Sequence, residues 1–122
     1  MTQIRQKDNC TPLASPHGEI VYELLGHAAG GAEQHSLAHI ELPPGKASRK
    51  HYHPQAEESY YILSGAARMA VDDQTCVLAP GQCIAIAPGR VHQIFNDGPA
   101  TLHFLAVCAP AWTPGNSVYP DD

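Results

Sequence analysis

Charged residues and long apolar runs are both scarce in the sequence. Lys, Arg, Asp and Glu make up 16% of the 122 residues and hydrophobic residues 43%, a balance that excludes an intrinsically disordered chain. No run of about 18 apolar residues occurs, so neither a membrane-spanning helix nor a membrane partner is predicted. The first residues also lack the apolar core of a signal peptide, and we expect a soluble, cytoplasmic protein.

Basic residues and paired cysteines are scarce as well. Seven Lys and Arg stand against twelve Asp and Glu, which gives a formal charge of −5, and the longest basic run is Arg49-Lys50. Nucleic acid backbones are bound by clustered positive charge, so no nucleic acid partner is predicted. Because no C-x-x-C pair occurs, we expect free and mostly buried thiols at Cys10, Cys76, Cys83 and Cys108.

Proline and glycine, by contrast, are abundant. Eleven Pro and ten Gly interrupt the chain at short intervals and leave little room for helices, which favours an all-β fold. The segments between them alternate or are rich in β-branched and aromatic residues, which is typical of short strands in a sandwich or barrel. Strands are expected at residues 19–25, 35–42, 59–64, 67–71, 75–78, 83–87, 91–95 and 101–107.

The length allows one domain of ordinary size. We expect the folded body at residues 19–108, with arms rather than strands at residues 1–18 and 109–122. Trp112 and Tyr119 are isolated aromatics in the second arm, and they are expected to fold back over the body or over a partner subunit.

Three of the eight histidines are placed where they can act together. Side chains two apart on a strand share a face, so His51 and His53 point the same way. Glu58 joins them if its strand pairs beside theirs, and His92 enters a strand in phase with the apolar Ile94. Such a cluster suits a divalent transition metal, although H-x-H pairs also occur on surfaces or as hydrogen-bonded core residues. The other histidines have single positions typical of surface or core residues: His17, His27, His35, His39 and His103.

Two longer motifs contain these residues. The first spans residues 45–65 and consists of Gly45, His51, His53, Glu58 and Gly65. The second spans residues 81–96 and consists of Gly81, Pro88, Gly89, His92 and Asn96. In their order and internal spacing they resemble the two motifs of the cupin superfamily, and the short gap between them resembles that of small single-domain bacterial cupins. Ala87 stands where the second motif usually has proline, which affects a turn and not a ligand position.

The resemblance implies a fold, a cofactor and four ligands. The fold would be a jelly-roll barrel, or double-stranded β-helix, of two antiparallel sheets. It would hold one divalent ion of Fe, Mn, Ni, Zn or Cu through the matching residues His51, His53, Glu58 and His92. Glu57 is the neighbouring alternative, but the spacing to Gly65 and the face shared with Tyr60 favour Glu58.

Cupins with these ligands catalyse several reactions, so three functions remain open. The first is a dioxygenase acting on an enol, diketone or phenolic compound. The second is a non-redox isomerase, epimerase, cyclase or lyase that uses the metal as a Lewis acid, and the third is a non-catalytic module that binds a small molecule or the metal. Small cupins usually pair, and apolar residues 20–22 and Trp112 near the chain ends predict a homodimer.

Two further residues are candidates for catalysis. Arg49 would share the inward face with His51 and receive a substrate carboxylate or hydroxyl, or else lie in solvent at the rim. Tyr60 would donate a proton or orient Glu58, or else be a packed core tyrosine. The apolar residues expected around them favour a small aromatic, keto or enol substrate over a phosphorylated sugar.

Overall fold

The computed structural model of the chain describes residues 4–120. The ends of the two predicted arms, residues 1–3 and 121–122, lie outside this range. The elements in chain order are η1 (Lys7–Asn9), β1 (Leu13–Ala14), β2 (Ile20–Leu25), β3 (Ser36–Leu42), β4 (Glu57–Ser64), β5 (Ala67–Val71), β6 (Gln74–Leu78), β7 (Cys83–Ile86), β8 (His92–Phe95), β9 (Leu102–Ala109) and η2 (Pro114–Asn116). No helix in the described part of the chain is long and apolar enough to cross a membrane.

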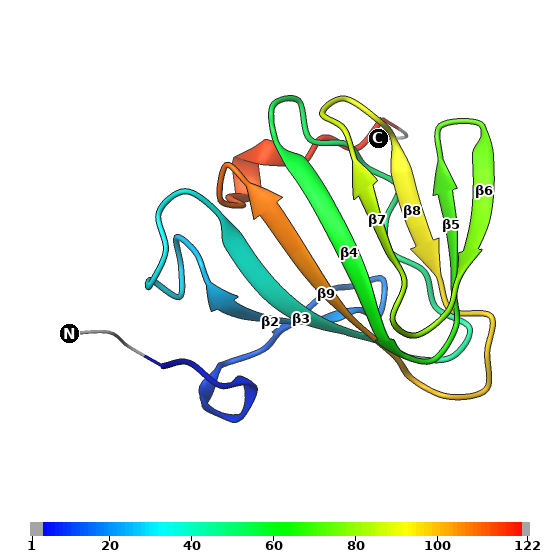
Figure 1. Cartoon of the computed structure of the whole chain (residues 1–122), viewed down its shortest axis with the longest axis horizontal. Helices are drawn as coiled ribbons and strands as arrows, with labels where there is room; N and C mark the ends of the chain where they lie inside the picture. Colours follow the sequence, from blue (N-terminus) through cyan, green and yellow to red (C-terminus); the bar gives the residue numbers. More distant parts are fainter. Residues whose placement is uncertain (1–3, 121–122) are drawn as a thin grey trace.

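The strands form two sheets that face each other (Figure 1). The larger has the order β1-β2-β3-β9-β4-β7, and the smaller has the order β6-β5-β8. Every pairing within them is antiparallel. This arrangement confirms the predicted all-β jelly roll of two antiparallel sheets.

The core lies between the sheets and follows the period-two alternation of the strands. Along β9 the even-numbered residues are buried and the odd-numbered ones are more exposed, as expected for a strand with one face covered. Ile62 and Phe104 from the large sheet are in the same core cluster as Met69 and Ile94 from the small one. Burial of such side chains stabilises the fold by roughly 1.5–3 kcal/mol each.

Two residues of the sequence motifs have structural roles at turns. Gly65 has a φ of 88°, and a Cβ there would lie 3.1 Å from the Leu102 Cα, so both conformation and space require glycine. Asn96 is buried, and its amide donates hydrogen bonds to the carbonyl oxygens of Leu42 (2.8 Å) and Ala100 (2.9 Å). It also accepts one from the Gly98 N–H, and so closes the turn that follows β8.

The structure departs from the sequence predictions at the N-terminal end and agrees with them at the C-terminal end. A short strand, β1, lies within residues 1–18, where no strand was expected, and it pairs with β2. Ile20 and Val21, two of the residues 20–22 predicted to pair with a second subunit, therefore have strands of the same chain on both sides. At the other end, residues 110–120 fold back over the body of the same chain, where Tyr52 and Val118 pair through their backbones.

The cysteines are free, as expected, but the prediction that most are buried is wrong. Cys108 is buried on the inner face of β9, whereas Cys76 and Cys83 are exposed and Cys10 is half-buried. Cys83 pairs with Tyr61, which is exposed on the outer face of β4. Alternation along β7 shows which of its residues share a face, but only the pairing with β4 determines which face is exposed.

Candidate metal centre

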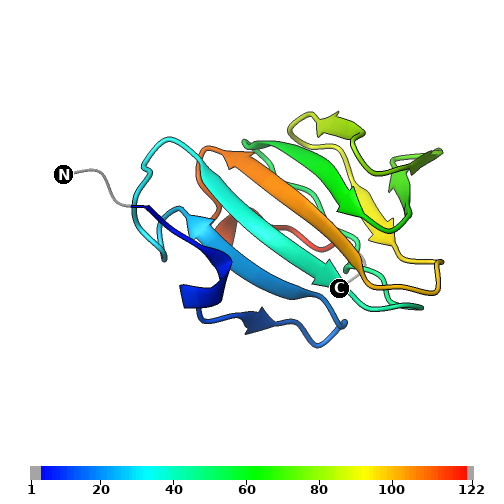
Figure 2. The same ribbon diagram turned by 60° about the horizontal axis from the view of Figure 1, so that its bottom comes forward.

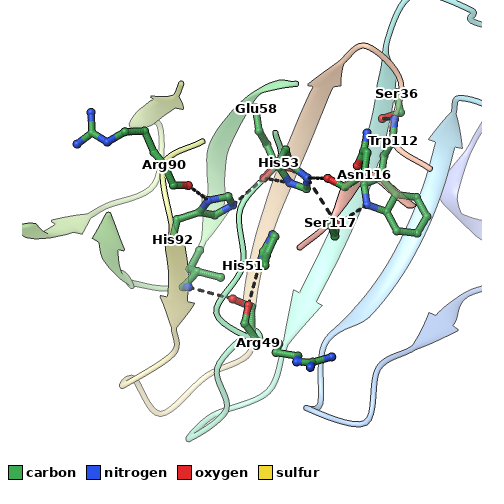
Figure 3. A network of polar contacts seen from close by, with 12 residues as sticks. Ser36, Arg49, His51, His53, Glu58, Arg90, His92, Trp112, Asn116 and Ser117 are labelled. Carbon is green, nitrogen blue, oxygen red and sulfur yellow. Dashed lines mark hydrogen bonds and ion pairs between the residues drawn. The ribbon is translucent and has the colours of Figure 1, made fainter. Parts of the chain in front are cut away.

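The four predicted ligands come together between the two sheets (Figure 3). His51 and His53 lie in the segment between β3 and β4, Glu58 lies on β4, and His92 begins β8. Glu58 joins the histidines, but not through the condition named from the sequence, because its strand does not pair beside the segment of His51 and His53. Instead, His51 pairs with His92 through reciprocal backbone hydrogen bonds of 3.1 and 2.8 Å, and β4 belongs to the other sheet.

The side-chain atoms that face one another in this cluster are ring nitrogens and a carboxylate oxygen. Glu58 Oε1 lies 3.2 Å from His53 Nε2 and 3.0 Å from His92 Nε2. The ring centroids of His51 and His92 are 4.3 Å apart, and one ligand atom from each of the four residues lies within 4.8 Å of the others. Glu57, the neighbouring alternative, is exposed on the opposite face of β4.

Backbone carbonyl groups fix the orientation of all three rings. His51 Nδ1 donates to the Arg49 carbonyl at 2.7 Å, His53 Nδ1 to that of Asn116 at 2.9 Å, and His92 Nδ1 to that of Arg90 at 3.1 Å. Because each Nδ1 carries the hydrogen, each neutral ring presents an unprotonated Nε2 to the cluster. This tautomer is the one that a metal ion requires.

The buried carboxylate gives the cluster its charge. Burial opposes ionisation of Glu58, but hydrogen bonds from His53 and His92, which require a proton on Nε2 of these rings, outweigh it and lower the pKa to about 2. For His53, burial is likewise outweighed by Glu58, so the pKa is raised; for His51, burial and nearby His92 lower the pKa to about 4. The site therefore combines a permanent negative charge with a neutral His51 ring at physiological pH.

Three imidazole nitrogens and a carboxylate oxygen fit a divalent transition-metal ion. Neutral rings that donate through Nδ1 have no hydrogen on Nε2 to offer to Glu58, so a proton or a cation must lie between these atoms. The nitrogen and oxygen donors suit borderline ions of the Fe, Mn, Ni, Cu and Zn group. The four groups could hold one such ion and leave coordination positions open for another ligand.

Tyr60 and Arg49, the two candidate catalytic residues, differ in burial and in the aromatic rings that they contact. Tyr60 is buried, and its ring lies edge-on to the His92 ring, with the two ring centroids 6.0 Å apart. Burial, followed by the charge of Glu58 and a hydrogen bond to it, raises the Tyr60 pKa well above its usual value. Arg49 is half-buried, and its guanidinium carbon lies 3.7 Å from the centre of the Tyr119 ring.

A cavity of about 270 Å³ adjoins the cluster. Its walls include Ile40, Ile94 and Phe104, together with His51, His53 and Glu58 of the cluster. The acidic residues Glu19 and Glu23 also line it, and Arg49 is the one lysine or arginine among its described lining residues. An engineered apolar cavity of about 150 Å³ holds benzene, so this cavity has room for a larger molecule of one or two small rings.

Part of the C-terminal segment supports the site, a role that was not predicted from the sequence. Asn116 supplies the carbonyl that orients His53, and Tyr119 stacks on Arg49. Trp112 anchors the segment, since its backbone N–H donates to Ser36 Oγ at 2.9 Å and its indole N–H to Ser117 Oγ at 3.0 Å (Figure 3). The aromatics signalled that the segment folds back, but a carbonyl partner leaves no mark in a sequence.

Known proteins share both the sequence and the fold. The chain is 32% identical over 106 residues to an uncharacterized protein of Methanocaldococcus jannaschii, covering 87% of this chain and 85% of that protein. It is also 32% identical over 83 residues to the tetracenomycin polyketide synthase protein TcmJ of Streptomyces glaucescens, covering 66% of this chain and 56% of that protein.

A solved structure extends the similarity to the whole fold. The crystal structure of a predicted oxalate decarboxylase from Thermotoga maritima superposes with a TM-score of 0.79 at 26% identity. The match covers 88% of this chain and 98% of that one. Residues 38–108, more than half of the chain, match the family model of the cupin domain, so the protein belongs to the cupin family.

Proposed function

We propose that the protein binds one divalent transition-metal ion through His51, His53, Glu58 and His92 and uses it to act on a small organic substrate. The observation that carries this proposal is the common orientation of the three rings, whose Nδ1 atoms all donate to backbone carbonyls, beside an ionised Glu58 that lies within 3.2 Å of the Nε2 atoms of His53 and His92. When bound, such an ion would supply Lewis-acid chemistry and, if it is redox-active, chemistry with O₂.

The cavity supports a small, mainly apolar substrate with one anionic or enolic end. Ile40, Ile94 and Phe104 offer apolar contact to a ring or a short chain. Arg49 is the basic group that can meet a carboxylate or enolate oxygen, whereas Glu19 and Glu23 repel a second negative group. A phosphorylated sugar, which needs several cations, fits these walls poorly.

Arg49 and Tyr60 have different roles in this proposal. The stack on Tyr119 holds the guanidinium of Arg49 at the cavity, so Arg49 binds and orients the substrate. The raised pKa of Tyr60 keeps its hydroxyl protonated at physiological pH, so it donates a hydrogen bond to Glu58 and orients the carboxylate. Tyr60 is therefore a positioning residue and does not itself lose a proton.

We propose a dioxygenase reaction on an enol, diketone or phenolic compound. The test is O₂ consumption by protein loaded with Fe²⁺, Mn²⁺ or Ni²⁺ and given 1,3-diketones, reductones or catechols. We expect O₂ uptake that disappears in His51→Ala and persists in His17→Ala, an exposed histidine in the N-terminal region. Absence of uptake across the panel, with the site formed by His51, His53, Glu58 and His92 loaded with metal, would contradict the dioxygenase reaction.

A non-redox isomerase, cyclase or lyase is the second candidate. It is favoured by the donor set, which suits zinc as well as iron, and by similarity to a polyketide synthase protein and a predicted oxalate decarboxylase. Conversion of substrate by the zinc-loaded protein under nitrogen would establish this alternative. Tight substrate binding without any product, measured by mass spectrometry, would instead indicate a non-catalytic binding module.

We also propose that the protein forms a homodimer through a sheet edge. β1 pairs with Ile20 and Val21 of β2, so these residues no longer support a dimer contact. The support comes instead from β6, which lies at the edge of the smaller sheet. Val77 on β6 is 71% exposed, which is unusual for a valine on a strand. Sedimentation at micromolar concentration should give the mass of two chains, and Val77→Lys should reduce it to that of one.

A further inference from the structure

A second group of histidine and glutamate side chains lies on the outer face of the larger sheet. It consists of His39 and Glu41 on β3 and His103 on β9. Glu41 is directly opposite His103 in the register of these strands, and His39 is two residues from Glu41 on the same face. The two neighbours of His39 on β3, Ala38 and Ile40, line the inner cavity, so this cluster lies on the opposite side of the sheet.

The distances in this outer cluster are close to those between ligands of one ion. His39 Nε2 and His103 Nδ1 are 3.0 Å apart, and His103 Nδ1 and Glu41 Oε2 are 3.8 Å apart. Two ligand atoms on a tetrahedral zinc ion, each at about 2.0–2.1 Å, are roughly 3.4 Å from each other. Shifts of a few tenths of an ångström would therefore bring both of these separations to the value at an ion, and all three ligand atoms already lie within 4.8 Å of one another.

The cluster has a rigid base and access to water. β3 and β9 are interior strands of the sheet, and each is hydrogen-bonded to a neighbour on both sides. The side chains of His103 and Glu41 remain 31% and 18% exposed, so water can reach an ion and complete its coordination. Rigid strands that hold two imidazoles and a carboxylate on one face reduce the ordering needed when an ion binds.

The Glu41 carboxylate already forms an ion pair with the ammonium group of Lys7, which lies outside the sheet. Lys7, in η1, donates to Glu41 Oε2 at 2.5 Å and lies 4.7 Å from the centre of the Tyr22 ring. Figure 2 shows the η1 turn, in dark blue, beside the strands of the larger sheet. The Lys7 side chain is about one-third exposed, and ion pairs of this exposure are weak, so Lys7 can be displaced.

We propose that His39, Glu41 and His103 form a second binding site for a divalent transition-metal ion, and that Lys7 competes with the ion for Glu41. Two imidazoles and one carboxylate are the ligand set of many open zinc sites, and Ni²⁺ and Cu²⁺ accept the same donors. The site is separate from the interior cluster and faces solvent rather than the cavity. Its occupancy therefore does not depend on the proposed reaction.

The test is calorimetric titration of untagged, metal-free protein with Zn²⁺. We expect two equivalents per chain for the wild type and one for His39→Gln/His103→Gln. The matched control is His27→Gln, an exposed histidine in the turn between β2 and β3, which should retain both. Lys7→Met should tighten the outer site about 2- to 5-fold, because it removes the competing ammonium group.

Variants of each cluster separate this inference from the proposed function. Glu58→Gln/His92→Gln should retain the equivalent bound outside, and adding His103→Gln should remove it. If Glu58→Gln/His92→Gln abolishes all binding, or if His39→Gln/His103→Gln still binds two ions, the outer site is contradicted. If His39→Gln/His103→Gln by itself abolishes all zinc binding, the interior site and the proposed function are contradicted instead.

Discussion

The inner and outer faces of the larger sheet place similar side chains in opposite surroundings. Inside, Glu58 meets histidine rings whose orientation is fixed by backbone carbonyls, in a region that excludes most water. Outside, His39 and His103 contact each other, and Lys7 covers the carboxylate. The buried cluster is oriented before any ion arrives, whereas the outer one must release an ammonium group, so the interior site should bind the more tightly.

Cysteine reactivity should show the largest difference between the two faces. Burial, followed by the charge of Glu58, raises the Cys108 pKa from 9.0 to about 12. At pH 8 the thiolate fraction of Cys108 is therefore about a thousandfold smaller than that of a cysteine with a pKa of 9.0. In metal-free protein, a thiol reagent should therefore modify the exposed Cys83 rapidly and Cys108 only after denaturation. Cys83→Ser should remove one fast-reacting thiol and Cys108→Ser none. Equal rates at the two cysteines would contradict the distinction between the faces.

Loss of the interior carboxylate should have the next largest effect. Glu58→Gln removes the charge that attracts the ion and one of the four donors. Because even residues that only support a ligand contribute 10- to 100-fold, we expect metal affinity to fall by about 100-fold or more. Competition with a chelating dye measures it, with Glu57→Gln on the exposed face of β4 as the matched control. Equal affinities for the two variants would exclude Glu58 as a ligand.

Removal of the C-terminal support should have a smaller effect. A chain truncated after Thr113 keeps the Trp112 anchor to Ser36 but loses the Asn116 carbonyl that orients His53. We expect the interior site to weaken about tenfold, while zinc bound by the outer cluster is unchanged. Ser117→Ala, which retains the carbonyl, is the control. Wild-type affinity in the truncated chain would show that the carbonyl is not needed.

Much of the fold follows from local features of the sequence. Proline and glycine mark the turns, and alternation between them locates the eight longer strands to within about two residues of their observed bounds. The same alternation places Glu58 with Tyr60 and His92 with Ile94, and all four are buried. The motif spacing then identifies the four residues of the interior cluster before any pairing of strands is known.

The remaining features depend on pairings between distant parts of the chain. His39, Glu41 and His103 become a cluster only through the register of β3 with β9, although His39-x-Glu41 has the same spacing as His51-x-His53. The exposure of Cys83 likewise depends on how β7 pairs with β4. Alternation shows which residues share a face but not which face is covered, so these features require the three-dimensional structure.

Anomalous diffraction from crystals of the zinc-loaded protein, recorded on both sides of the zinc absorption edge, would locate the bound ions directly. We predict a peak at about 2.0–2.2 Å from the Nε2 atoms of His51, His53 and His92 and from a carboxylate oxygen of Glu58. A fully loaded crystal without a peak among these four side chains would contradict the interior metal centre, whatever is bound at the outer cluster.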